Sequence, residues 1–281
     1  MKLTACLTIN NRTPEVCGKV ADSLLLPGNL PDELVVVLDR CTPEVKDGAH
    51  AAYDQLDCPV RWITIPGEPG WRSPVKAWNL AFLAATGDVL YCFSSETVQE
   101  AGNLIRVRQQ MQDEHYGYFD GWAGDGPRPE FGSHCEVSVY HGSVSCSCGP
   151  YGQEVNWNGS APGNLFCDAA HPRPLGFIWA APRSAVSAIG GYDEEFAKGF
   201  WYDDNDFFYR LWKQGLDFVF DDSISGTHLH HARQTLETEE GRWGIAKNQQ
   251  TMLAKYGCVN PLETEMIREE RKPGRTIWRH P

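Results

Sequence analysis

The sequence lacks an excess of basic residues and lacks long apolar runs, and each absence excludes a class of protein. Lysine and arginine total 25 against 37 aspartates and glutamates, so the 281-residue chain carries a formal net charge of -12. This charge disfavours non-specific binding to nucleic acid and to anionic membranes. No apolar run approaches the roughly 20 residues of a membrane span. We therefore expect no transmembrane segment.

Signals for export and for a disulfide framework are also missing. The apolar segment at residues 3–9 is too short for a signal peptide and continues into Asn10-Asn11-Arg12, which predicts a first strand and a cytoplasmic protein. The ten cysteines include no Cys-x₂-Cys pair, the usual spacing of a zinc site. Without a secretion signal they do not predict disulfides. A structural zinc site stays an open alternative; its candidate ligands are Cys135, Cys146, Cys148, Cys167, His134 and His141.

The first ninety residues alternate predicted strands with predicted helices. Thr13-Pro14-Glu15 supplies a capping residue, a first-turn proline and an early acid, which together indicate a helix start. Ser73-Pro74 indicates a second one. Repeated alternation predicts one α/β domain, in which helices flank a mainly parallel central sheet. The predicted strands are Leu3–Ile9, Leu34–Leu38, Val60–Ile65 and Val89–Phe93.

The pattern changes twice in the rest of the chain. Residues 116–175 mix glycine, proline, aromatics and cysteine without a clear period, which predicts a functional insert and not an idle loop. Regular pattern returns at residues 176–231. The polar, basic segment 266–281 predicts a mobile tail or an arm over the surface. We therefore expect one domain over residues 1–265, with a donor-binding half at 1–98 and an acceptor and catalytic half at 176–231.

Polar residues follow three of the predicted strands directly. Ligands of parallel sheets bind beyond the carboxyl ends of the strands. The candidate residues at these ends are Asn10 with Arg12, Asp39 with Arg40, and Ser94-Ser95-Glu96.

Segments at these strand ends resemble the inverting family 2 glycosyltransferases and their galactosyltransferase-like relatives. The strand that ends at Asp39 resembles the family's second strand, whose final aspartate contacts the nucleotide base. The run from Gly87-Asp88 into Ser94-Ser95-Glu96 resembles the approach to the family's Asp-x-Asp metal motif. Two positions depart from the family: Arg40 replaces a second acid, which leaves the base preference open, and Ser94 replaces the first acid of the metal motif.

The second half of the resemblance lies near the carboxyl end. Gly190-Gly191-Tyr192-Asp193-Glu194 and Asp203-Asp204-Asn205-Asp206 resemble the family's Gly-Gly-Phe-Asp-Glu and Glu-Asp-x-Asp segments. His228 matches a histidine that often completes the metal site. The resemblance covers residues 3–98 and 176–231 and implies a single nucleotide-binding domain of the A-type glycosyltransferase fold.

The resemblance implies transfer of a sugar from a nucleotide sugar, here a UDP-sugar, to an acceptor hydroxyl with the help of Mn²⁺ or Mg²⁺. Both cations prefer oxygen ligands, and Mn²⁺ tolerates an imidazole. Glu96 and His228 are therefore the expected metal ligands. Asp204 is the expected general base, with Asp203 as a helix cap or a ligand of the acceptor hydroxyl. The expected donor-site residues are Asn10, Arg12, Asp39, Lys76, Ser94, Ser95 and Glu96.

Structural explanations for the same residues stay open. Glu96 and the acids at 203–206 suit helix capping, Asp39 suits a turn, and Arg12 and Lys76 suit a solvated surface. Two other functions also stay open: a retaining transferase on the same fold, and an inactive nucleotide-sugar-binding protein, which the degraded metal motif favours. The acceptor is undetermined among glycans, lipid carriers, proteins, small molecules and modified nucleic acid, although the net charge argues against the last.

Overall fold

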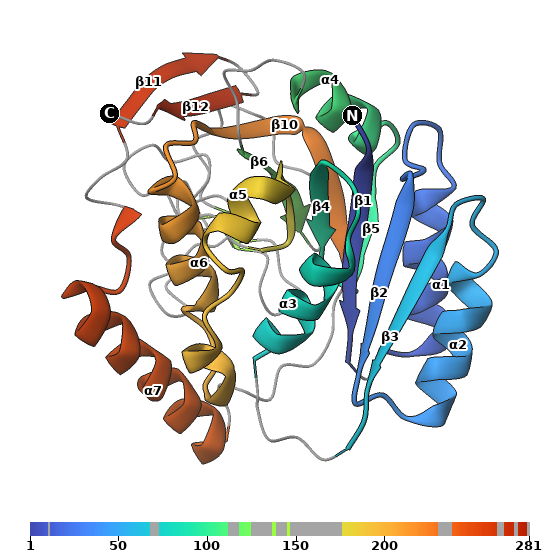
Figure 1. Ribbon diagram of the computed structural model, residues 1–281, viewed down its shortest axis with the longest axis horizontal. Helices are drawn as coiled ribbons and strands as arrows, with labels where there is room; N and C mark the ends of the chain where they lie inside the picture. The colour runs from blue at the N-terminus through green and yellow to red at the C-terminus, as the bar shows by residue number, and fades with distance from the viewer. Residues whose placement is uncertain are drawn as a thin grey trace.

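A single mixed sheet forms the centre of the computed structural model, which describes residues 1–10, 12–67, 73–111, 118–124, 137–138, 145–146, 176–229, 238–262, 267–272 and 275–279. The strand order is β3-β2-β1-β4-β9-β6-β10-β12-β11, with β5 paired to β10 (Figure 1). The strands are β1 Leu3–Ile9, β2 Glu33–Asp39, β3 Val60–Ile65, β4 Val89–Phe93, β5 Thr97–Gln99, β6 Tyr118–Gly124, β9 Ile178–Pro182, β10 Phe218–His228, β11 Ile267–Lys272 and β12 Arg275–Arg279; β7 Val137–Ser138 and β8 Ser145–Cys146 pair separately.

The half of the sheet nearest the amino terminus is parallel, as the alternation of strands and helices predicts. Strands β1, β2, β3 and β4 all pair in parallel. Strand β9 is antiparallel to both β4 and β6, while β6 and β10 pair in parallel. The carboxyl ends of β1, β2 and β4 therefore lie at one edge of the sheet, where the sequence places its candidate donor-site residues.

Helices cover both faces of the sheet (Figure 1). Apolar residues of α1, α2 and α4 pack in one core with Leu34, Val36 and Leu38, whereas those of α3, α5 and α6 pack in a second core with Val35 and Val37. This alternation explains why the central residues of β2, Leu34–Leu38, are all apolar. The helices are α1 Pro14–Leu24, α2 Pro43–Tyr53, α3 Val75–Ala84, α4 Asn103–Met111, α5 Arg183–Ala188, α6 Asp203–Trp212 and α7 Glu239–Tyr256, with a 3₁₀ turn η4 at Glu194–Lys198.

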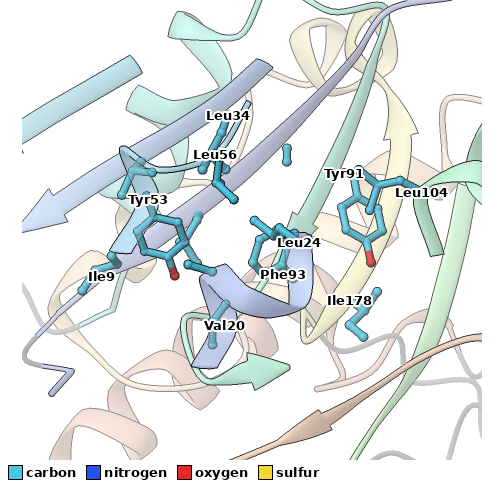
Figure 2. Packing of buried hydrophobic residues seen from close by; sticks show 14 of the residues in the cluster. Ile9, Val20, Leu24, Leu34, Tyr53, Leu56, Tyr91, Phe93, Leu104 and Ile178 are labelled. Atoms are coloured by element: carbon cyan, nitrogen blue, oxygen red, sulfur yellow. The ribbon is translucent and has the colours of Figure 1, made fainter. Parts of the chain in front are cut away.

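The first core anchors the strands that end at the site. Figure 2 shows Val20 and Leu24 of α1 and Tyr53 of α2 near Ile9 and Phe93, which come from β1 and β4. All five side chains are fully buried. Burial of such side chains contributes about 1.5–3 kcal/mol each to stability. The packed first core therefore fixes the ends of β1 and β4.

Helices α2, α5 and α7 are not predicted from the sequence. Helix α2 begins like α1: Thr13 and Thr42 each precede a Pro-Glu pair, and each side chain accepts a hydrogen bond from a backbone N–H three residues on. The signal for α2 was thus present in the sequence. Helix α7 buries Gly241, Gly244 and Asn248 besides Met252. Because most of these are small or polar, α7 carries no apolar period.

Residues 266–281, expected to form a mobile tail or an arm over the surface, add two strands to the sheet in their described part. Strands β11 and β12 form an antiparallel pair, and β12 pairs with β10. Ile277 is buried in the first core. The added strands cover an edge that β10 would otherwise leave unpaired.

Part of the expected insert also joins the sheet. Strand β6 lies between β9 and β10, although it falls within residues 116–175. Most of that insert lies outside the described residues, as do Cys135, Cys148, Cys167 and both histidines of the zinc alternative. Within the described ranges, the cysteines at positions 6, 17, 41, 58, 92 and 258 form no disulfide. None of the helices in the described ranges is long and apolar enough to cross a membrane.

Candidate active site

A pocket of about 370 Å³ lies between the strand ends and the first turn of α6. Its size falls in the range of small-molecule sites. The pocket brings together most of the residues that the sequence singles out. Its lining comprises Thr8, Asn10, Arg12, Asp39, Arg40, Ser73, Pro74, Trp78, Ser94, Ser95, Glu96, Gly176, Phe177, Tyr192, Phe200, Trp201, Asp203 and Asp204.

Asp39 ends β2 and is held by its own neighbour. Arg40 donates from Nε to Oδ1 at 2.7 Å and from Nη2 to Oδ2 at 2.8 Å, a two-pronged ion pair. The Asp39 side chain is only 2% exposed. Arg40 has φ 56°, in the left-handed region, and this turn folds its side chain back onto the preceding residue. The residue that replaces the family's second acid therefore binds the first one.

Glu96 is bound in the same way by a residue far away in the sequence. Arg12 donates from Nε to Oε2 at 3.0 Å and from Nη2 to Oε1 at 3.2 Å. The Ser95 hydroxyl also donates to Oε2, at 2.7 Å. The Glu96 side chain is 10% exposed and that of Arg12 is 26% exposed. The carboxylate that is expected to bind a metal is thus paired with the Arg12 guanidinium in this structure.

The backbone of His228 lies beside this motif. In the pairing of β10 with β5, His228 is opposite Thr97, and the N–H of Leu229 donates to the carbonyl of Glu96 at 2.7 Å. The fold therefore brings the backbones of both expected metal ligands together. The side chain of His228 lies outside the described residues.

Three other expected donor-site residues, Asn10, Ser94 and Lys76, differ in their surroundings. Asn10 donates to the carbonyl of Asp39 at 2.7 Å and so joins the ends of β1 and β2. The hydroxyl of Ser94 lies 2.6 Å from that of Thr97, within the turn that presents Glu96. Lys76 lies outside the pocket lining, with its ammonium 3.7 Å from Glu194.

Asp203 and Asp204, at the start of α6, have neutral partners in place of arginines. The Ser73 hydroxyl donates to Asp203 Oδ2 at 2.6 Å. Asp204 accepts from the N–H of Gly176 at 3.1 Å and from the hydroxyl of Tyr192 at 3.0 Å. A Cβ atom at position 176 would lie 2.9 Å from Asp204 Oδ1, so this approach requires a glycine.

This environment changes the proton affinity of both carboxyls. Burial raises the pKa of Asp203, which the Ser73 hydrogen bond opposes. Burial, and then the nearby charge of Asp203, raise the pKa of Asp204 to about 7. Such a carboxyl exchanges a proton near neutral pH, as a general base must.

The Gly190-Gly191 pair sets the position of Tyr192. Both glycines are left-handed, with φ 74° and 75°. Asn79 then holds Tyr192, accepting from its N–H at 2.8 Å and donating to its carbonyl at 2.9 Å. The Tyr192 ring stacks on Phe207 with ring centres 4.1 Å apart. The Gly190-Gly191 motif thus places the Tyr192 hydroxyl within hydrogen-bond distance of Asp204.

The backbone before α6 is strained where it borders the pocket. Trp201 and Tyr202 both have φ 63°, an uncommon value for residues with side chains. Asn248 of α7 is fully buried and donates to the carbonyl of Trp201 at 2.9 Å. Trp201 is 37% exposed and lines the pocket beside Asp203. Helix α7 therefore holds the strained segment in place.

Asp206 serves the helix and not the pocket. It is fully buried and binds Arg210 at 2.7 Å, the pair expected one helical turn apart. Lys255 and Tyr256 of α7 also bind its carboxylate, at 2.5 Å and 2.7 Å. These contacts join α7 to α6 and fix the turn that carries Asp203 and Asp204.

Solved structures that resemble this chain include a sugar transferase. A mannosyltransferase from Pyrobaculum calidifontis, solved with GDP-Man and Mn²⁺, matches with a TM-score of 0.61 and 12% identity over 90% of this chain. Two structures of TarS from S. aureus match with TM-scores of 0.50 and 0.52, each at 14% identity over 83% of this chain. The fold is the A-type glycosyltransferase fold.

These likenesses extend to the fold alone. The chain spans 64% of the mannosyltransferase, and 59% and 36% of the two TarS chains. No protein-family model matches the sequence, and no curated protein matches it.

For four residues of this pocket the sequence alone indicates no contact. The sequence marks Arg40 as a strand-end candidate that departs from the family pattern, Ser73 as a helix start and Tyr192 as part of a motif, and it gives no signal for Gly176. Each acts through a carboxylate that the sequence does identify. Ser73, Tyr192 and Gly176 do so through tertiary contacts that no local pattern encodes, whereas Arg40 does so through a left-handed turn.

Proposed function

We propose that this chain is a glycosyltransferase that moves a sugar from a nucleotide sugar to an acceptor hydroxyl, with inversion, and that Asp204 is its general base. The observation that carries the proposal is the environment of Asp204. A carboxyl with a pKa of about 7 lines a polar pocket, at the end of the sheet where A-type folds bind nucleotides.

The charges of the described lining support a role for a divalent cation. Arg12 and Arg40 are matched by Glu96 and Asp39, and the acceptor side adds further carboxyls. A nucleotide diphosphate is strongly anionic, and this balance offers it no net positive charge. A bound Mn²⁺ or Mg²⁺ would supply that charge and stabilise the leaving diphosphate.

The side chains available fit a cation that takes its remaining ligands from the substrate phosphates and from water. Within the described residues, no group of three or more histidine, cysteine, aspartate or glutamate side chains is placed to hold a metal. Magnesium is typically bound by one or two carboxylates together with substrate phosphates and water. Glu96 is the proposed carboxylate ligand, and His228, whose backbone lies next to it, is the proposed imidazole ligand.

The proposed reaction is a single displacement. Asp204 takes the proton of the acceptor hydroxyl as that oxygen attacks the anomeric carbon of the donor sugar. The bond from the anomeric carbon to the diphosphate oxygen breaks, and the nucleoside diphosphate leaves. Asp203, held by Ser73, orients the acceptor hydroxyl beside Asp204. Trp201 offers an exposed aromatic surface for the acceptor.

The proposed donor is a UDP-sugar, and a GDP-sugar is the second candidate. Two observations favour the second candidate. The mannosyltransferase structure contains GDP-Man. Arg40 lines the pocket, and an arginine fork recognises O6 and N7 of guanine. The acceptor class and the cytoplasmic location expected from the sequence stay predictions.

A thermal-shift panel of UDP-, GDP- and other nucleotide sugars, with Mn²⁺ or with chelator, tests the donor assignment. A donor present at about 100 times its Kd adds about 2.7 kcal/mol of stability. We expect stabilisation by a UDP- or GDP-sugar that is larger with Mn²⁺. Failure of every nucleotide sugar to stabilise the chain would refute the proposal.

A second measurement separates an enzyme from an inactive binding protein. We expect the stabilising donor to release its nucleoside diphosphate slowly in the presence of Mn²⁺, with water as the acceptor. Binding without any release, over hours and with simple sugars added, would favour the inactive binding protein. The anomeric configuration of the released sugar, observed by NMR before it equilibrates, distinguishes inversion from retention.

A further inference from the structure

The ion pair between Arg12 and Glu96 occupies the carboxylate that the proposed metal needs. Both oxygens of Glu96 accept hydrogen bonds from the Arg12 guanidinium. Oε2 accepts a second bond from the Ser95 hydroxyl, so both of its lone-pair directions are taken. A cation at Oε2 must therefore displace one of these donors, and a cation at Oε1 would lie against the Arg12 Nη2 that donates there.

The guanidinium is the partner that can leave. Arg12 and a divalent cation at the same carboxylate repel each other, whereas the Ser95 hydroxyl is neutral. The Arg12 side chain is 26% exposed and lines the pocket, while Glu96 is 10% exposed and fixed by a turn. Movement of Arg12 into the pocket breaks its two hydrogen bonds to Glu96.

We propose that Arg12 is an exchangeable cation: it holds Glu96 while the pocket is empty, and it transfers to the donor's diphosphate when Mn²⁺ takes its place. The proposal rests on the function proposed above. Guanidinium binds carboxylate and phosphate with the same two-pronged geometry. One charge-assisted pair is thereby exchanged for another, and no buried charge is left without a partner.

The exchange makes metal and nucleotide bind cooperatively. Mn²⁺ alone must displace Arg12 with no new partner for the guanidinium, so it binds weakly. Mn²⁺ together with a nucleoside diphosphate offers that partner, so each ligand tightens the other by the same factor. Without Arg12 this coupling is reduced.

The test measures Mn²⁺ affinity by electron paramagnetic resonance of the free ion, in the absence of nucleotide. Arg12→Ala should bind Mn²⁺ roughly tenfold more tightly than wild type, because the cation no longer competes with a charge-assisted pair. Arg108→Ala is the matched control. It removes the same charge from a side chain that is 25% exposed and paired with Asp32 outside the pocket. It should change Mn²⁺ affinity little.

The same titrations with saturating UDP or GDP complete the test. Nucleotide should tighten Mn²⁺ binding markedly in wild type and in Arg108→Ala, and much less in Arg12→Ala. Thermal unfolding checks that all three proteins are folded. Equal Mn²⁺ affinities for the two variants would overturn the exchange, as would weaker Mn²⁺ binding by Arg12→Ala or nucleotide binding that ignores Mn²⁺ in every protein. Failure of wild type to bind either nucleotide would instead count against the proposed function.

Discussion

The two sides of the pocket use the same chemical group in different ways. On the donor side, Asp39 and Glu96 are each held by the two-pronged guanidinium of an arginine. On the acceptor side, Asp203 and Asp204 receive hydrogen bonds from a serine hydroxyl, a tyrosine hydroxyl and a backbone N–H. One side thus pairs each carboxylate with an arginine. The other side places two carboxyls next to each other with neutral hydrogen-bond donors.

This difference assigns different work to the two sides. A carboxylate paired with a guanidinium holds a fixed position, and it binds a metal only when the guanidinium is displaced. A buried carboxyl with neutral donors and a like charge nearby has a raised pKa and exchanges protons near neutral pH. Under the proposed function, the first side would bind the anionic donor and its metal, and the second would remove the proton.

The largest expected effect comes from removing basicity on the acceptor side. Asp204→Asn keeps the size of the side chain and can still accept a hydrogen bond from Gly176 or Tyr192. Loss of a general base should slow nucleoside diphosphate release from the best donor by a factor of about 10²–10⁴. Donor affinity, measured by thermal shift, should barely change.

Asp203→Asn is the comparison variant for Asp204→Asn. It keeps an acceptor for Ser73 and removes the charge that raises the pKa of Asp204. Its rate should fall less, with a pH profile moved to lower pH. If Asp204→Asn keeps more than about a tenth of the wild-type rate, the base lies elsewhere.

A smaller effect is expected on the donor side, in binding and not in proton transfer. Glu96→Gln removes the proposed metal ligand and the Arg12 pair together. UDP or GDP affinity measured by calorimetry with Mn²⁺ should fall by about tenfold or more. Affinity in chelator should not fall, because Arg12 no longer pairs with Glu96 and can bind the diphosphate. Glu194→Gln, outside the pocket lining, is the control. Equal nucleotide affinity with Mn²⁺ and with chelator in wild type would show that Glu96 does not serve a metal.

A still smaller effect should appear as a displaced pH profile. The base acts when deprotonated, so the rate should rise as pH increases through the Asp204 pKa of about 7 and level off above it. Tyr192→Phe removes a hydrogen bond that lowers this pKa and keeps the stacked ring. The midpoint should therefore move to higher pH.

Tyr256→Phe is the control for that displacement. Its hydroxyl donates to Asp206, on the far side of the helix from the pocket chemistry. We expect an unchanged midpoint in this variant. A midpoint that stays in place in Tyr192→Phe would mean that the measured ionisation belongs to another group.

Much of the fold was predictable because it is encoded by local pattern. The apolar run in β2 is typical of a strand buried on both faces, and its alternate residues enter the two cores. The apolar residues Phe207, Phe208, Leu211 and Trp212 of α6 recur at helical spacing and are fully buried. Asp206 and Arg210 pair one turn apart, a spacing that favours ion pairs on a helix. In each case the residues that decide the structure are near neighbours in sequence.

The partners within the site were not predictable for the opposite reason. Arg12 and Glu96 are 84 residues apart, and Ser73 and Asp203 are 130 apart. Their pairing depends on how strand ends and helix starts converge, which sequence spacing does not encode. Arg40 is adjacent to Asp39, but its left-handed backbone gives it no local signature. Helix α7 was missed because its buried face consists largely of glycine and asparagine.

The smallest expected effect concerns the left-handed backbone of Arg40, and a comparison of two variants isolates it. Arg40→Ala and Arg40→Gly both remove the guanidinium, and both leave buried Asp39 without this partner. They differ because the left-handed φ of 56° strains the backbone of alanine and does not strain that of glycine. Arg40→Gly should therefore unfold in urea with a free energy about 1 kcal/mol higher than Arg40→Ala.

The same pair of substitutions at Arg106, inside helix α4, gives the opposite expectation. There glycine should be about 1 kcal/mol less stable than alanine, because helical backbone favours alanine. The sign change between the two positions separates backbone strain from the loss of an arginine. If alanine is the more stable variant at position 40 as well, the turn after β2 does not require the left-handed conformation. The hold on Asp39 would then come from the guanidinium alone, and the donor side would be less rigid than the acceptor side.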